Sequence, residues 1–195
     1  MAIESRTKQT LQDVFEKNKY NLSDAAAQST RWYAQQAKLM GKQGYTSKRV
    51  LSGVSGDWAQ VPVPGKLYMY AYDAKHKATL PYWDKYPLTF PFKLLKDGFL
   101  GINMHYLPYA YRIKVLDGLI GIKLRKTSKH YKLQLSWELI SSVAAYQPLQ
   151  VCVHRYLYSQ MRTGLRIIHS ADWATAMLLP THKFVGATPS YVWKQ

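Results

Sequence analysis

Hydrophobic and polar positions alternate most regularly in the middle of the chain. Between Lys66 and Asp73 every second residue belongs to the same face, and both faces are apolar or aromatic: Leu67, Met69 and Ala71 on one, Tyr68, Tyr70 and Tyr72 on the other. This period-two pattern predicts a strand that is covered on both sides. Residues 99–107 repeat the alternation directly after the turn signal of residues 96–98.

Prolines divide the segment between these two predicted strands. Pro81, Pro87 and Pro91 predict short extended pieces, because proline lacks the donor that a sheet needs and suits edges and bends. Several short strands joined by glycine and proline bends are typical of a small closed or nearly closed sheet. The pattern therefore predicts a small, strongly curved antiparallel sheet or an SH3-like barrel over about residues 64–107.

Helical spacing dominates on both sides of this predicted sheet. A weak amphipathic pattern covers residues 3–20, and a better one runs from the cap Ser23 to Gly41. Further helices are predicted by the apolar stripes of residues 109–122, 133–146, 151–161 and 172–179, with residues 162–168 as a turn. The fold class is therefore α+β, with N-terminal and C-terminal helices flanking the sheet.

The order of these predicted elements divides the chain into two parts. Residues 1–56 form a helical N-terminal arm and a basic linker, in which residues 41–56 carry four glycines and three serines. Residues 57–195 form a single globular domain with an aromatic β core at 64–107, a helical part at 108–180 and an extended tail at 181–195. The linker is either a solvated connector or a basic strap that lies along a polyanion or enters a neighbouring subunit.

Composition adds a strong charge to this picture. The 195 residues include 27 lysines and arginines against 11 aspartates and glutamates, a formal net charge of +16. A surplus of this size favours polyanionic partners such as nucleic acid, acidic protein surfaces or anionic lipid. The alternative is an assembly subunit whose basic face meets an acidic neighbour.

The densest basic cluster is residues 123–132, where five fixed positive charges surround Tyr131 without any acidic residue. Mobile cations beside an aromatic face are suited to phosphate and base contacts, although basic runs are often merely solvated loops. With the basic linker, this cluster gives the predicted contact residues for nucleic acid or a partner: Lys42, Lys48, Arg49, Lys123, Arg125, Lys126, Lys129 and Lys132.

Catalytic motifs are not evident in the sequence. No HExxH, CxxC, glycine-rich phosphate loop or GxSxG occurs, and the single cysteine, Cys152, fits a buried apolar position. A metal-dependent nuclease built on Asp73, Asp84 and Asp97 is a minor alternative. We expect no enzyme activity, no cofactor, no metal and no small-molecule substrate. No apolar run approaches the ~20 residues that cross a bilayer, so no membrane partner is expected.

Three segments together resemble a known family. The first is the central segment, with Tyr-Asp-x-Lys at 72–75, Leu-Pro-Tyr-x-Asp-x-Tyr-Pro-Leu at 80–88 and Gly-Phe-x-Gly-Ile-Asn-Met-His-Tyr at 98–106. The other two are the helix RIKVLDGL at 112–119 and the closing SADWATAMLLPTHKFVGA at 170–187. Over about residues 64–190, with the first 60 residues outside the match, this pattern resembles virion proteins of T4-like contractile-tailed phages that are known as DNA end protectors or head-completion proteins. The family brings no catalytic residues to carry over.

This resemblance implies a non-enzymatic virion protein, assembled in the host cytoplasm and placed at the neck, the tail or the DNA end. Its implied partners are other phage structural proteins and a double-stranded DNA end. The alternative is a baseplate or tail subunit that makes no DNA contact and docks its basic arms on acidic partner proteins.

Overall fold

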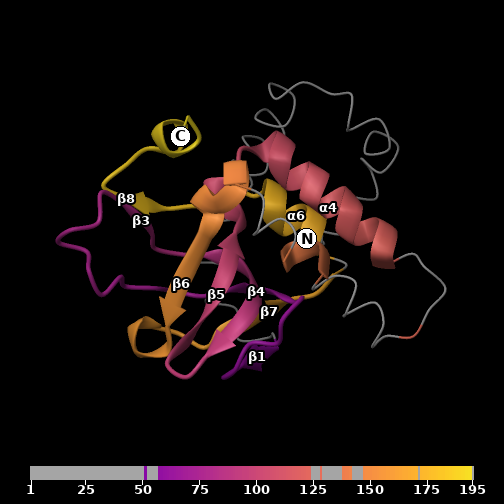
Figure 1. Cartoon of the computed structure of the whole chain (residues 1–195), viewed down its shortest axis with the longest axis horizontal. Coiled ribbons are helices and arrows are strands. Elements are labelled where there is room, and N and C mark those ends of the chain that lie inside the picture. Colours follow the sequence, from indigo (N-terminus) through magenta and orange to yellow (C-terminus); the bar gives the residue numbers. More distant parts are fainter. Residues whose placement is uncertain are drawn as a thin grey trace, which may run out of the picture.

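The computed structural model describes residues 51, 57–123, 128, 138–141, 147–170 and 172–194 (Figure 1). Its main feature is a six-stranded antiparallel sheet with the order β1-β7-β2-β4-β5-β6. The strands are β1 (Trp58–Ala59), β2 (Leu67–Met69), β4 (Leu88–Leu95), β5 (Gly98–Asn103), β6 (Val153–Leu157) and β7 (Leu165–Ile168). A mixture of helices and an antiparallel sheet agrees with the predicted α+β class.

The sheet is open. β1 and β6 lie at its opposite edges, and among the described strands they pair only with β7 and β5 respectively. The described strands therefore do not close into the SH3-like barrel that was one of the two predicted forms. The sheet also extends beyond residues 64–107, because β1, β6 and β7 come from segments outside that range.

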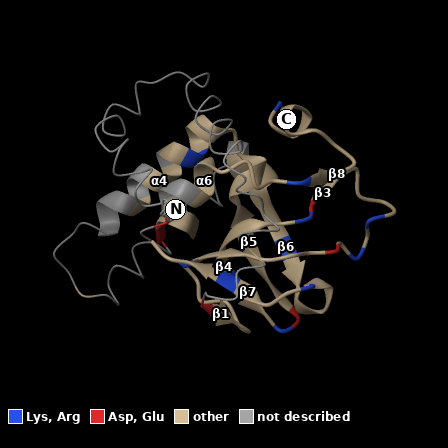
Figure 2. Cartoon of the chain, turned by 180° about the vertical axis from the view of Figure 1, so that it is seen from behind, with Lys and Arg blue, Asp and Glu red and all other residues tan. Residues whose placement is uncertain are grey.

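A second, two-stranded sheet joins β3 (Trp83–Asp84) to β8 (Phe184–Val185). Figures 1 and 2 show this small sheet beyond the β6 side of the main sheet, away from the helices α4 and α6. The C-terminal segment continues from β8 into the short helix α7 (Pro189–Val192), which Thr188 caps by accepting a hydrogen bond from the Tyr191 backbone. The tail predicted as extended thus contains a strand and a helical turn.

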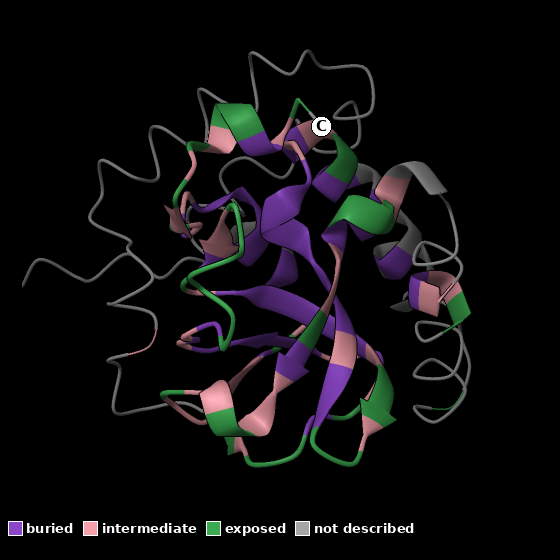
Figure 3. Ribbon diagram, turned by 60° about the vertical axis from the view of Figure 1, so that its left-hand side comes forward, coloured by how far each residue is buried: buried purple, intermediate pink, exposed green. Residues whose placement is uncertain are grey.

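β2 separates two hydrophobic clusters, as its alternating sequence predicted. Leu67 and Met69 pack into the larger cluster, together with residues of α4 (Tyr109–Lys123) and α6 (Trp173–Leu178). Tyr68 and Tyr70 pack into a second cluster on the other face, with Phe99 of β5 among its members. The central strands are accordingly buried along most of their length (Figure 3). The predicted strand with two covered faces is confirmed.

β4 and β5 form the hairpin that the turn signal of residues 96–98 predicted, with Leu95 opposite Gly98. The sequence predicted that Pro91 would end an extended piece, but this residue lies inside β4. The register of the pair shifts between Pro91 and Lys93. A proline has no N–H to donate, so an irregularity at this position lets the strand continue on both sides of it.

The predicted helices at residues 109–122 and 172–179 are present as α4 and α6, which pack side by side (Figure 1). The predicted helix at residues 151–161 is absent. Its residues form strand β6, which lies between two short 3-10 helices, Gln147–Cys152 and Tyr158–Gln160. Residues 165–168, expected in a turn, form β7. The part of the chain at 108–180 that was predicted as helical thus supplies two strands.

Other predictions fall on parts of the chain outside the described residues. These include the arm and linker of residues 1–56, apart from Leu51, and most of the predicted helix at 133–146, of which residues 138–141 are described and helical. Cys152 is buried and free, as expected from its apolar surroundings. In the parts of the chain that the structure describes, no helix is long and apolar enough to cross a membrane.

Candidate functional site

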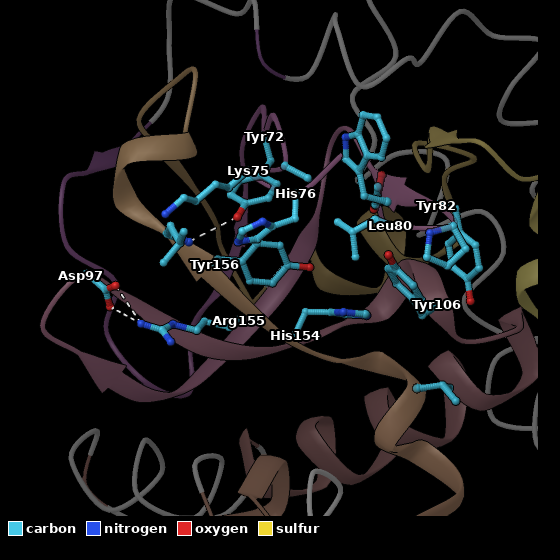
Figure 4. A pocket seen from close by; sticks show the side chains of 16 residues that line it. Tyr72, Lys75, His76, Leu80, Tyr82, Asp97, Tyr106, His154, Arg155 and Tyr156 are labelled. Carbon is cyan, nitrogen blue, oxygen red and sulfur yellow. Dashed lines mark hydrogen bonds and ion pairs between the residues drawn. The ribbon is translucent and has the colours of Figure 1, made fainter. Parts of the chain in front are cut away.

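A groove of about 760 Å³ runs along the edge of β6 that pairs with no other described strand, between β6 and the loop of residues 73–82. We call it the β6 groove. Its lining combines aromatic rings with cations: Tyr72, Tyr82, Trp83, Tyr106 and Tyr156, with Lys75 and Arg155. Figure 4 shows Lys75 and Tyr82 on the loop side of the groove and Tyr106, Arg155 and Tyr156 on the opposite side.

The floor of the groove rests on a buried polar network centred on Asp84. The Asp84 carboxylate accepts hydrogen bonds from His105 Nδ1 (2.6 Å), from Asn103 Nδ2 (3.1 Å) and from the backbone N–H groups of Tyr86 and Lys183. Burial alone would raise the pKa of Asp84, but His105 and these donors hold it below its usual value. The carboxylate is therefore ionised and fully satisfied, which fixes β3 against β5 and β8.

His105 continues this network toward the C-terminal segment. Because the carboxylate cannot donate, His105 Nδ1 carries the proton, and burial lowers the pKa of the ring so that it is neutral. Its Nε2 atom lies 2.9 Å from Thr181 Oγ1. A carboxylate, an imidazole and a hydroxyl in this order also occur in hydrolase triads. Thr181 is only 1% exposed, however, and neither it nor His105 lines the groove, so a ligand in the groove does not meet the hydroxyl and the arrangement is structural.

Arg112 supplies the positive charge of this region from beneath the network. Its guanidinium is fully buried and donates to the backbone carbonyls of Leu107 (2.8 Å), Met177 (3.0 Å) and His105 (3.1 Å). Burial lowers its pKa to about 10, so it stays charged at neutral pH. One side chain thus joins the start of α4, the end of β5 and α6.

His154 forms part of the groove wall and has an incomplete set of hydrogen bonds. Its ring stacks on Tyr106 with centroids 4.0 Å apart, and it bonds to the backbone of Val151. Nε2 is buried and has no hydrogen-bond partner among the described residues. Burial lowers the pKa of His154 to about 4. The ring is therefore neutral, and since Nδ1 must hold the proton for Val151, Nε2 is an unused acceptor.

The charges around the groove are mostly basic. Lys75 and Arg155 lie on its rim, and the exposed residues Lys77, Lys85 and Lys183 belong to the same loop and the small sheet. Figure 2 shows basic positions gathered in this part of the described chain. Asp97 on the rim is engaged by Arg155, whose Nη2 atom lies 2.7 and 2.8 Å from its two carboxylate oxygens. The rim therefore presents a surplus of positive charge.

We expect the substitution Arg155→Gln to leave the stability of the protein unchanged within measurement error. Both partners of the Arg155–Asp97 pair are more than half exposed, and exposed pairs of this kind often contribute nothing measurable. Urea unfolding followed by circular dichroism would test this. A clear fall in the midpoint would mean that Arg155 supports the hairpin as well as the groove rim.

The contact residues predicted from the sequence cannot be compared with this groove. Lys42, Lys48, Arg49, Arg125, Lys126, Lys129 and Lys132 lie outside the described residues, and of Lys123 only the backbone, at the end of α4, is described. The three carboxylates of the nuclease hypothesis do not assemble. Asp84 is buried, while Asp73 and Asp97 pair with surface cations, and no group in the described parts could hold a metal ion.

Sequence reasoning did not identify the groove or the network behind it. The signals were present in the central segment of the family resemblance, because its three motifs supply Tyr72, Lys75, Tyr82, Asp84 and Tyr106 to the lining. Nothing in a linear pattern shows that these motifs meet. The other wall comes from β6, more than forty residues further along the chain, which was predicted as a helix.

In the part of the chain described by the structure, the groove offers aromatic rings and cations. Comparison with protein families gives the family to which the chain belongs. The family model described as Phage T4 terminal DNA protecting protein matches residues 6–195, and the chain is a member of this family. The match confirms the resemblance found in the central motifs and extends it to the N-terminal arm. No curated protein and no solved structure matches the chain.

Proposed function

We infer that this protein covers the end of phage DNA in the particle and blocks exonucleases there by occupying the end, without catalysing a reaction. The observation that carries this proposal is the match of nearly the whole chain to a family of terminal DNA protecting proteins. The net charge of +16 supports it, since neutralisation of phosphates by lysine and arginine drives most non-specific DNA affinity. The protein resides in the virion, where other phage structural proteins surround it.

The phosphate contacts are assigned to two sets of cations. The first is the predicted set in the linker and in residues 123–132. The second surrounds the β6 groove and is formed by the exposed residues Lys75, Lys77, Lys85, Lys183 and Arg155. Together the two sets give one molecule the cations to bind phosphates at the DNA end, and a protein bound there keeps an exonuclease from the end.

Binding to a short duplex is expected to weaken steeply as salt rises. Neutralised phosphates release counterions, so the slope of log affinity against log salt is about −0.9 per contact. Changing Lys123, Arg125, Lys126 and Lys129 together to glutamine should make this slope shallower by about 4. Fluorescence anisotropy with a labelled duplex between low and physiological salt measures the slope, and digestion of linear DNA by an exonuclease measures protection.

A control variant with the same net charge as the quadruple glutamine variant distinguishes the effect of these four residues from the effect of lowering the total charge. It replaces four described lysines that do not line the groove: Lys66, Lys93, Lys96 and Lys194. We expect the control to keep most of the salt slope and the protection of DNA ends. Binding that is absent or independent of salt in the unmodified protein would contradict DNA contact and favour the assembly subunit that docks on acidic partner proteins.

A further inference from the structure

The β6 groove has the dimensions and the aromatic lining of a site for a flat ligand. Its volume of about 760 Å³ lies within the usual range of small-molecule pockets. Tyr82 and Trp83 line the groove on the loop side and are half-buried. Rings of this kind bind nucleobases by stacking, and they accept any base because every base has a π face.

The charges at the rim suit the phosphate of the same ligand. Lys75 and Arg155 are exposed and line the groove, one on each wall. The carboxylates nearby are already engaged: Asp84 by its four donors and Asp97 by Arg155. A nucleotide with its base between the walls would place its phosphate against Lys75 and against Arg155, whose guanidinium also holds Asp97, with no unpaired carboxylate opposing it.

His154 adds a requirement for a hydrogen-bond donor. Figure 4 shows its imidazole in the groove between Tyr156 and Tyr106. Among the described residues nothing donates to Nε2, and leaving a buried acceptor unsatisfied is unfavourable. Thr181 and Asn103 are hydrogen-bonded within the network behind the groove, whereas His182 Nδ1, which does not line the groove, is the other unpartnered ring nitrogen nearby. A ligand that brings an N–H group to Nε2 would complete the set.

We propose that the β6 groove binds one unpaired nucleobase bearing an exocyclic amino group, at the frayed or overhanging end of DNA, with the amino group donating to His154 Nε2. This assignment rests on the proposed function for its DNA source, but the groove's chemistry can be tested on mononucleotides alone. The base stacks beside Tyr82 and Trp83, and its phosphate contacts Lys75 and Arg155. An extended peptide added to the same edge of β6 is the competing occupant.

Titration calorimetry with three small ligands separates stacking, hydrogen bonding and phosphate contact. They are dAMP, the same purine nucleotide without its 6-amino group, and deoxyribose 5′-phosphate. We expect dAMP to bind about tenfold or more tightly than the sugar phosphate, which is in the range for one stacked base. The nucleotide without the amino group should bind about tenfold more weakly than dAMP, because it leaves Nε2 unsatisfied.

The substitution His154→Phe keeps an aromatic ring on Tyr106 but removes the acceptor, so this variant should bind the two purine nucleotides equally. His169→Phe is the matched control, since His169 is exposed, pairs with Asp57 and does not line the groove. It should keep the preference of the unmodified protein. Circular dichroism on both variants confirms that they are folded.

Three outcomes would overturn the proposal. These are equal binding of both purine nucleotides by the unmodified protein, binding of deoxyribose 5′-phosphate as tightly as dAMP, and no mononucleotide binding, which is expected if the groove holds a peptide. These results are separate from those on the proposed function. Protection of DNA ends without any base preference would support the proposed function and contradict this site. A preference for dAMP without protection of DNA ends would support the site and contradict the proposed function.

Discussion

Replacing Arg112 with methionine is expected to lower the free energy of unfolding by about 3–5 kcal/mol. Methionine fills a similar volume but donates no hydrogen bond, so the carbonyls of Leu107 and Met177 lose the Arg112 donor and that of His105 keeps only Trp193 Nε1. The guanidinium also lies over the rings of Tyr109 and Trp193, 4.5 and 5.4 Å from their centroids, and those contacts are lost too. Urea unfolding monitored by circular dichroism at neutral pH gives the difference directly.

Two further variants make this result interpretable. Arg112→Lys keeps the charge but cannot reach three carbonyls in a fixed fork, so its loss of stability should lie between those of methionine and the unmodified protein. Arg162→Met removes an arginine whose side chain is 57% exposed and pairs with Asp73 on the surface, and it should change little. If Arg112→Met destabilised the protein by less than about 1 kcal/mol, the carbonyls would be finding other donors.

Local patterns predicted the parts of the fold whose partners lie nearby in the sequence. The alternation around Tyr68 and Tyr70 determines which residues face each cluster, whatever strands lie on either side. The turn at residues 96–98 joins β4 to β5 within a few residues, and α4 follows Pro108 with buried positions at helical spacing. These elements depend on periodicity and turn chemistry, which a single sequence displays.

The prediction of a helix at residues 151–161 was wrong because the strand that pairs with β6 lies about fifty residues upstream. Residues 151–161 form a short apolar run, and such a run fits a buried helix and a buried strand equally well. What selects the strand is β5, where Gly98 opposes Leu157. A Cβ added at Gly98 would come within 1.9 Å of the Tyr156 carbonyl oxygen, so the close approach of β6 depends on that glycine. No linear pattern links the two positions.

The candidate site was hidden for the same reason. Asp84 and His105 are 21 residues apart and Thr181 is 76 residues beyond His105, so the network exists only after the small sheet has packed against β5. Sequence reasoning directed attention to dense basic runs, because charge clusters are visible without a fold. The groove gathers its rings and cations singly from distant segments, and only the family resemblance pointed to several of them together.

Lowering the pH from 6.5 to 4.5 is expected to destabilise the protein by about 5 kcal/mol through His154 and His182. Burial lowers the pKa of His154 to about 4 and that of His182 to about 3, while both titrate near 6.5 when the chain is unfolded. Between these values the unfolded state binds protons that the folded state does not. Stability is therefore complete above pH 6.5 and is lost progressively as the pH falls.

The double variant His154→Gln, His182→Gln separates this effect from the titration of other groups. His105 and Arg112 lower the pKa of His182 further and Asp84 raises it, but all three remain in the variant. We expect the variant to lose about 5 kcal/mol less than the unmodified protein over the same pH interval. Urea unfolding at pH 6.5, 5.5 and 4.5 compares the two slopes. Parallel slopes would show that these histidines take up protons in the folded protein, which their burial beside Tyr106, Tyr109 and Trp193 opposes.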